Sequence, residues 1–201
     1  QKKISIIIQE NKVIFINTLG DVTALDTLTG RLLWQLPTQS KSIYEEAMFL
    51  KISDMVLEDN SVFFSNNMNE FFSLDVSTGI LNWKQVVNSS LRPSIVNNFI
   101  FTVSEEGFLI VIDSKSGKII RSTDLFDKFK KKKRKKIKPT GFVLGSKKLY
   151  LSTSTGRLLI VDIETGKTQS IIKIDSEKIS RPIILKQSLF VVKNNSVIKL
   201  N

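Results

Sequence analysis

Four aspartates at equivalent places in a repeated motif are the residues of this sequence whose types and spacing could do chemistry. Each aspartate precedes a glycine by four residues, and a threonine or serine stands directly before the glycine. Four carboxylates in such a pattern could bind calcium or act in acid–base catalysis. The motif residues are Asp26, Thr29 and Gly30; Asp75, Thr78 and Gly79; Asp113, Ser116 and Gly117; and Asp162, Thr165 and Gly166.

The same residue types also suit a tight turn, here called the turn motif. An aspartate carboxylate accepts bonds from the backbone N–H groups that follow it, a hydroxyl does so more weakly, and glycine adopts a positive φ without a Cβ clash. Apolar residues typical of strands flank the motif on both sides. A catalytic group is needed once, whereas this aspartate recurs, so we expect strand–turn–strand units in which the aspartates cap the turns.

The composition narrows the functions that the chain can have. Its 201 residues include no cysteine and no histidine, which excludes disulfides, thiol nucleophiles, the usual zinc ligands and histidine acid–base chemistry. No run of 18 uncharged apolar residues is present, so no transmembrane segment is predicted. We therefore expect no catalytic residue, no cofactor and no metal site.

The spacing of the motifs predicts the elements that position them. Their glycines lie 49, 38 and 49 residues apart, a period typical of propeller blades. Three short β-rich runs precede each motif and a fourth follows it; in the first repeat they are 5–8, 13–17, 22–25 and 31–35. Each repeat therefore predicts a four-stranded antiparallel meander.

The expected fold class is an all-β β-propeller, because a meander this small cannot bury both of its faces and must stack on its neighbours. The whole chain, 1–201, is expected to form a single partial domain of about four and a half blades. We expect it to be a fragment of a ring of roughly eight, with a two-chain ring as the less favoured alternative. The blade units are approximately 4–36, 54–86, 93–123, 140–173 and 182–201, the last lacking its fourth strand.

Two tryptophans are the expected contacts between blades. Trp34 and Trp83 each follow their motif glycine by four residues, on the fourth strand, where a large ring can wedge against the next blade. Arg121 and Ser170 stand at that position in the later repeats. We expect those two blades to be docked less firmly.

The stretch 24–34, which reads Ala-Leu-Asp-Thr-Leu-Thr-Gly-Arg-Leu-Leu-Trp, and its copy at 73–83 resemble the tryptophan-docking repeat of the pyrroloquinoline-quinone-like (PQQ-like) β-propellers. Within that superfamily the chain is most similar to the C-terminal half of the BamB family of outer-membrane assembly factors. The resemblance implies a non-enzymatic periplasmic scaffold, associated with the outer membrane of a Gram-negative bacterium, with the barrel-assembly machinery as its protein partner. Any lipid anchor would lie upstream of Gln1.

Two other functions stay open. A PQQ-dependent dehydrogenase shares the repeat, but such enzymes hold their cofactor with a central set of acidic, basic and aromatic groups, usually beside adjacent cysteines, and this chain has no cysteine. The third function is an extracytoplasmic sensor domain, which further transmembrane or kinase segments would reveal. The fold alone does not separate the three.

The link at 38–51 is a candidate partner-binding segment. It contains Tyr44 and Phe49 beside two glutamates, and Asp54 follows it. Exposed aromatic side chains with a nearby carboxylate are typical binding anchors. The segment either covers a blade edge or receives a partner, and BamB-like proteins use loops between blades in the second way.

A second link, at 128–138 and here called the basic loop, carries nine Lys or Arg among eleven residues. These hold nine of the net +11 charges, which leaves the rest of the chain near +2. The loop is either a solvated surface segment or a patch that attracts anionic headgroups, an acidic protein face or nucleic acid without sequence specificity. We expect Phe129 and Ile137 to anchor it. Its central residues are Lys130, Lys131, Lys132, Lys133, Arg134, Lys135 and Lys136.

Overall fold

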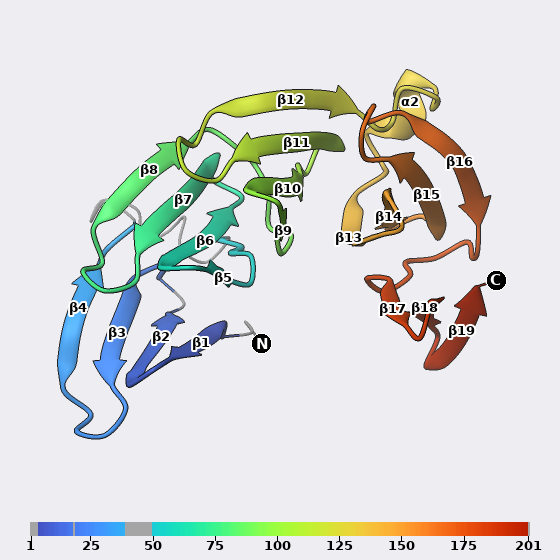
Figure 1. Ribbon diagram of the computed structural model, residues 1–201. Coiled ribbons are helices and arrows are strands. Elements are labelled where there is room, and N and C mark those ends of the chain that lie inside the picture. Colours follow the sequence, from blue (N-terminus) through green and yellow to red (C-terminus); the bar gives the residue numbers. More distant parts are fainter. Residues whose placement is uncertain (1–3, 18, 39–49, 201) are drawn as a thin grey trace. The chain divides into compact units, whose positions relative to one another are not determined.

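The computed structural model describes residues 4–17, 19–38 and 50–200, and strands make up most of this part of the chain (Figure 1). They form five antiparallel sheets, four with four strands and one with three. Within the described residues the only helix is α2, Lys131–Arg134, between the third and fourth sheets. The expected all-β class is confirmed.

In each of the first two sheets the strands follow one another as a meander, in the orders β1-β2-β3-β4 and β5-β6-β7-β8. The expected fourth strand after the motif is present in both. Their bounds are β1 Ile6–Gln9, β2 Lys12–Ile16, β3 Val22–Asp26, β4 Leu32–Leu36, β5 Val56–Glu58, β6 Ser61–Asn66, β7 Glu70–Asp75 and β8 Leu81–Gln85.

The later sheets repeat this order, and the fifth has three strands in the order β17-β18-β19. Their bounds are β9 Ser94–Val96, β10 Phe99–Val103, β11 Phe108–Asp113, β12 Ile119–Asp124, β13 Pro139–Gly145, β14 Lys148–Thr153, β15 Arg157–Asp162, β16 Thr168–Lys173, β17 Ile183–Leu185, β18 Ser188–Lys193 and β19 Ser196–Leu200. In the fourth and fifth sheets, as in the first two, each strand pairs antiparallel with the next in sequence.

Two-residue turns close several of the hairpins. Asn97 and Asn98 between β9 and β10 have φ of 50° and 65°, and Asn194 and Asn195 between β18 and β19 have φ of 45° and 59°. A turn with two positive φ values matches the twist of the strands that it joins, and asparagine tolerates this conformation better than most residues. The paired asparagines therefore fix where these two hairpins reverse.

The chain divides into two compact units. The first comprises Gln1–Ile100 with Asp113–Lys118, and the second comprises Phe101–Ile112 with Ile119–Asn201. In the first unit, facing residues of the first two sheets, such as Ile14, Val22 and Phe64, are buried in one hydrophobic cluster. Burial of this apolar surface is what a thin sheet cannot achieve alone.

The turn glycine receives a tryptophan in two places within the first unit. Trp34 Nε1 donates a hydrogen bond to the carbonyl oxygen of Val76, at 3.0 Å. A Cβ added to Gly79 would lie 2.5 Å from Cδ2 of this indole, and Gly79 has φ +71°. Trp83 repeats the arrangement with the carbonyl of Ser114, at 2.9 Å, and with Gly117. Glycine thus serves both the turn and the docked ring.

In the second unit Arg121 takes the place of the tryptophan. Its Nη2 donates to the carbonyl of Ile163 at 2.5 Å, and its Nη1 donates to the carbonyl of Glu164. Ile163 directly follows a motif aspartate, as Val76 does in the first unit. A guanidinium therefore reaches the carbonyl that the indole N–H reaches elsewhere, a contact that the expectation of looser docking did not foresee. Ser170 is exposed.

We predict that Gly79→Ala destabilises the protein more than Gly30→Ala does. Gly30 has nearly the same φ, +68°, but no heavy atom of the described residues lies within 4 Å of its added Cβ. The alanine at Gly30 should cost about 1–2 kcal/mol for the left-handed backbone alone. At Gly79 the indole of Trp34 must also move, which should add roughly 1–3 kcal/mol.

Urea denaturation of the two variants and the unaltered protein measures this difference. Similar losses at the two glycines would show that the indole contact contributes little, and the docking role assigned to Trp34 would then be wrong.

Candidate functional site

Each motif aspartate is the centre of its own turn. Asp75 Oδ1 accepts hydrogen bonds from the backbone N–H and the hydroxyl of Thr78, both at 2.8 Å, and Gly79 N–H donates to the Asp75 carbonyl at 2.8 Å. The second carboxylate oxygen, Oδ2, accepts a bond from Asn60 Nδ2 at 2.7 Å. The other three aspartates, Asp26, Asp113 and Asp162, accept the same pair of bonds from Thr29, Ser116 and Thr165.

These bonds stabilise the ionised carboxylates. In the first three motifs the pKa of the aspartate is lowered, and the largest cause is the hydrogen bond from the hydroxyl three residues later. These pairs are Asp26 with Thr29, Asp75 with Thr78, and Asp113 with Ser116. For Asp162 the backbone N–H of Thr165 is the largest cause of the lowered pKa, followed by its hydroxyl. A general acid or base at neutral pH needs a carboxyl pKa that is raised, so the shift runs against catalysis.

The structure does not bring the four carboxylates together. Asp26 and Asp75 belong to the first and second sheets, Asp113 is the last residue of β11 in the third sheet, and Asp162 is the last residue of β15 in the fourth. In residues 4–17, 19–38 and 50–200, no three acidic side chains are grouped so that they could hold a metal ion. Their bonding supports the turn-capping interpretation over a calcium or catalytic site.

Of the predicted partner-binding residues, Tyr44 and Phe49 lie outside the described residues, as does most of the link at 38–51. Asp54 is described, and it lines a groove of about 510 Å³ in the first unit. The other lining residues are Ile4, Ser5, Ile6, Ile7, Met55, Val56, Leu57 and Arg92. The groove therefore follows two strands, β1 and β5, that are far apart in sequence.

The groove is held together by a bond between its two sides, since Met55 N–H donates to Ser5 Oγ at 2.8 Å. Ile4 and Ile6 line it with 56% and 59% of their surface exposed. Sequence reasoning did not select these two isoleucines. The alternation of Ile4, Ile6 and Ile8 was a signal that they share one face of the strand, but not that this face stays exposed.

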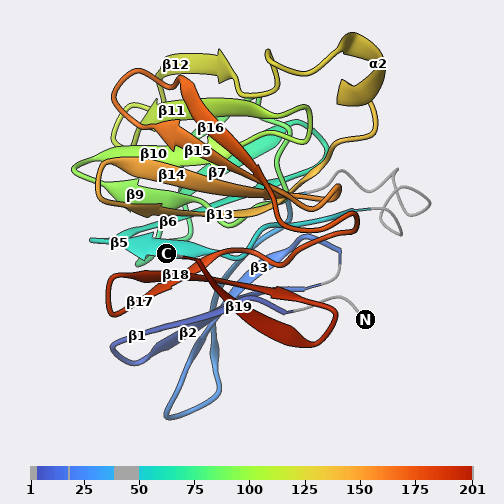
Figure 2. The same ribbon diagram turned by 90° about the vertical axis from the view of Figure 1, so that its right-hand side faces the viewer.

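The basic loop leaves β12 and contains α2, as Figure 2 shows at its upper right. Ile137 is buried, and Phe129 packs edge-on against Phe126 with ring centroids 5.8 Å apart. The expectation that Phe129 and Ile137 anchor the loop is therefore confirmed. The four-residue helix within it was not expected, because a run of lysines at neutral pH repels itself.

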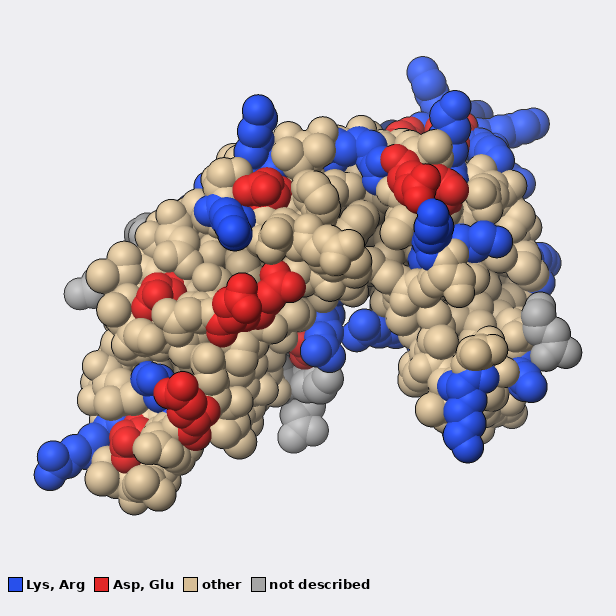
Figure 3. All heavy atoms as spheres, viewed as in Figure 1, with Lys and Arg blue, Asp and Glu red and all other residues tan. Residues whose placement is uncertain are grey.

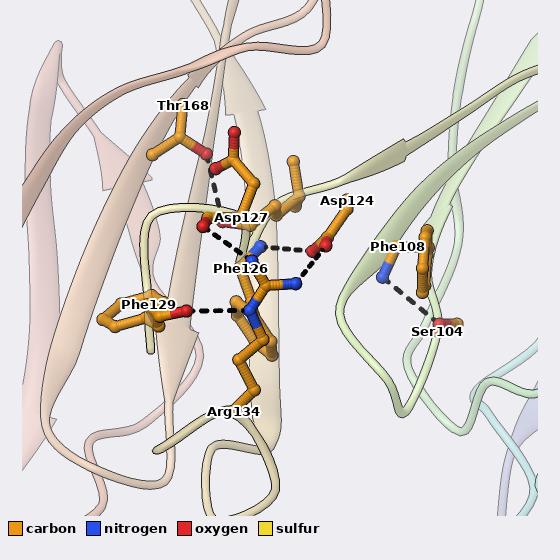
Figure 4. Close-up of polar contacts among 9 residues, drawn as sticks. Ser104, Phe108, Asp124, Phe126, Asp127, Phe129, Arg134 and Thr168 are labelled. Carbon is orange, nitrogen blue, oxygen red and sulfur yellow. Dashed lines mark hydrogen bonds and ion pairs between the residues drawn. The ribbon is translucent and has the colours of Figure 1, made fainter. Parts of the chain in front are cut away.

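Arg134 is the main polar anchor of the loop (Figure 4). Its Nη1 forms an ion pair with Asp124 Oδ2 at 2.6 Å, its Nη2 donates to the Asp127 carbonyl at 2.6 Å, and its Nε donates to the Phe129 carbonyl at 2.8 Å. Asp124 also accepts a bond from Phe126 N–H at 2.8 Å. Arg134 is thus engaged in holding the loop, although the sequence placed it among the cations of the patch.

The eight lysines of the loop are exposed. The ammonium of one of them, Lys128, donates a hydrogen bond to the Thr168 carbonyl at 2.5 Å, which connects the start of the loop to β16. Lys and Arg side chains gather over the region of α2 at the upper right of Figure 3. The loop thus combines an anchored base with a cationic surface.

A comparison with protein-family models identifies the family. The model described as outer membrane protein assembly factor BamB matches residues 2–123, more than half of the chain. The chain belongs to this family. No curated protein sequence matches it.

Several solved structures share the fold of this chain. BamB from Moraxella catarrhalis has a TM-score of 0.77 and 14% identity over 99% of this chain and 57% of that chain. The computationally designed Ika8 protein has a TM-score of 0.73 and 14% identity over 99% and 58%. The Cps50 (Swd1) β-propeller domain from Myceliophteria thermophila has a TM-score of 0.71 and 15% identity over 95% and 62%.

These likenesses confirm the β-propeller fold that the repeats predicted. The chain spans less than two thirds of the length of each of the three structures. In the described part of this BamB-family chain, no helix has both the length and the apolar character needed to cross a membrane.

We predict that Asp75→Asn lowers the melting temperature by about 2–4 °C at neutral pH, because a neutral amide accepts the bonds of Thr78 more weakly than a carboxylate does. The folded-state pKa of Asp75 lies below its ordinary value of 3.8. Its contribution is therefore complete above pH 3.8 and is lost as the pH falls through the lower, folded value.

Thermal melts of the unaltered and Asp75→Asn proteins from neutral to acid pH test this. The gap between the two melting temperatures should narrow below pH 3.8. A gap that widens in acid would contradict the prediction. It would mean that the turn stabilises the protonated carboxyl, whereas Asp75 Oδ1 accepts two hydrogen bonds that favour the ionised form.

Proposed function

We propose that the chain is a non-enzymatic scaffold that binds other proteins during assembly of outer-membrane β-barrels, in the periplasm at the outer membrane of a Gram-negative bacterium. The observation that carries the proposal is the match of residues 2–123 to the BamB family. The propeller fold is shared by the scaffold and by the competing functions, so it does not decide between them. The partner is the barrel-assembly machinery.

The absence of enzymatic function is part of the proposal. The family model and the fold leave room for a PQQ-dependent dehydrogenase, which is the competing function. Two observations favour the scaffold: the carboxylates of the turn motifs bond to their own turns, and the sequence has no cysteine. A cofactor site would need several such groups directed at one place.

We expect no spectral change when PQQ and calcium are titrated into the full-length protein. The four motif carboxylates are occupied by their turns and are spread over four sheets, so they offer the quinone and the ion no common site. Absorbance of the quinone reports binding directly. Saturable binding with one quinone per chain would overturn the non-enzymatic assignment.

The groove lined by Asp54 is the proposed docking surface, and its occupant is an extended segment of the partner. β1 and β5 stand at the ends of the strand orders of their sheets, so each has an edge without a described strand beside it. Exposed Ile6 offers apolar contact, and Asp54 and Arg92 offer charges of both signs. Such an edge can accept a further strand through backbone bonds.

Tyr44 and Phe49 are proposed to contribute to the same interaction. This part of the proposal rests on the sequence, which places the two aromatic residues a few positions before Asp54. Aromatic side chains commonly supply much of the binding energy at protein interfaces.

We predict that Ile6→Glu in the full-length protein reduces capture of the barrel-assembly machinery at least tenfold, since it places a charge in the apolar part of the groove. Leu28→Glu is the matched control. Leu28 is 81% exposed in the same first-sheet region, and it does not line the groove. The control variant should capture partners as the unaltered protein does.

Pull-down from solubilised outer membranes, followed by quantitative immunoblotting of the barrel component, gives the measurement. Failure of the unaltered protein to capture the machinery would contradict the assembly role. Normal capture by Ile6→Glu would instead contradict only the docking surface.

A further inference from the structure

We propose that the basic loop is a binding surface for anionic lipid headgroups. This inference is independent of the proposed scaffold function, which concerns a groove in the first unit. It concerns the second unit, where the loop at 128–138 concentrates nine of the net +11 charges of the chain.

The loop contains two kinds of residue: those that anchor it to the rest of the protein and those whose charged side chains are exposed. Arg134 makes three bonds at the base of the loop, Ile137 is buried, and Phe129 packs on Phe126. These anchors fix the path of the backbone. Lys128 is bonded to the Thr168 carbonyl. The remaining side chains project outward as ammonium groups, and they are Lys130, Lys131, Lys132, Lys133, Lys135, Lys136 and Lys138.

The anchoring explains how so many like charges persist together. A lysine run without anchors would extend away from the protein to separate its charges. Here Asp124 is the only carboxylate recorded in an ion pair with a described residue of the loop, and it pairs with Arg134. No carboxylate of the described residues is paired with the lysines of the loop, so their charges can attract an anionic ligand.

The chemistry of the exposed residues favours lipid over nucleic acid. Proteins that bind single strands stack bases on aromatic rings, and arginine, with its planar set of donors, is the favoured cation for nucleic-acid recognition. The only aromatic residue of the loop, Phe129, lies against Phe126, with the Arg157 guanidinium 5.8 Å from its ring centroid. Its only arginine, Arg134, is engaged at the base.

The same residues also disfavour a shaped protein interface. Such interfaces have buried aromatic, arginine or aliphatic anchors at their centre. The one aliphatic side chain of the loop, Ile137, is buried within the protein itself. Several neighbouring ammonium groups without an apolar anchor match a surface of diffuse negative charge, which is what a layer of anionic headgroups provides.

Vesicle co-sedimentation of the full chain tests the proposal. The probes are phosphatidylcholine vesicles with and without phosphatidylglycerol, at low and high salt. We expect binding only to the anionic vesicles, and we expect high salt to reverse it because the contact is exposed. The variant with six Lys→Gln changes, at Lys130, Lys131, Lys132, Lys133, Lys135 and Lys136, should lose at least tenfold in partitioning.

A control variant removes the same charge elsewhere. It carries six Lys→Gln changes at exposed lysines outside the loop, at Lys118, Lys167, Lys173, Lys178, Lys186 and Lys199. It has the same net charge as the loop variant and should keep most of the vesicle binding. Equal losses in the two variants would mean that net charge alone drives binding, and the proposal would be wrong.

Two further outcomes would also overturn it. The first is that the unaltered protein ignores anionic vesicles. The second is that a single-stranded oligonucleotide binds the loop more tightly than the vesicles do, which would assign the patch to nucleic acid. Thermal melting of both variants verifies that they fold, and capture of the barrel-assembly machinery by the loop variant separates this result from the scaffold function.

Discussion

The fold depends on the contact between a side chain on the fourth strand of one sheet and the turn glycine of the next. A sheet of four short strands exposes too much apolar surface to be stable alone, so neighbouring sheets must pack against it in a fixed position. Asp75 fixes the turn, the turn directs the Val76 carbonyl toward Trp34, and Gly79 leaves room for the indole. One short motif therefore supplies both the reversal of the chain and the docking point.

This arrangement limits the chemistry that the repeated aspartates can perform. The Oδ1 atom of each motif aspartate is occupied by a hydroxyl and a backbone N–H, and the pKa of each carboxyl is lowered. Such groups neither exchange protons at neutral pH nor turn toward a shared ligand. The groove and the basic loop are both formed by segments outside the motifs, where binding residues are commonly found.

The sequence was sufficient where the signal was local and repeated. The meander of strands and the places of Trp34 and Trp83 follow from spacing alone, and Phe129 was recognisable as an apolar residue in a charged run. The groove could not be predicted, because it joins β1 to β5 across some fifty residues. The role of Arg121 was also hidden, since its sequence position does not show that its guanidinium reaches Ile163.

The sequence did not show that the one arginine of the basic loop has a different role from its lysines. This difference decides which residues anchor the loop and which stay exposed. Both residues add one charge to the run, but a guanidinium presents several donors in a rigid plane, whereas an ammonium is a compact charge on a flexible stem. Arg134 uses that plane to join Asp124, Asp127 and Phe129 at once. An ammonium on a flexible stem does not present this fixed set of donors, so the loop depends on its single arginine for the anchoring that leaves its lysines exposed.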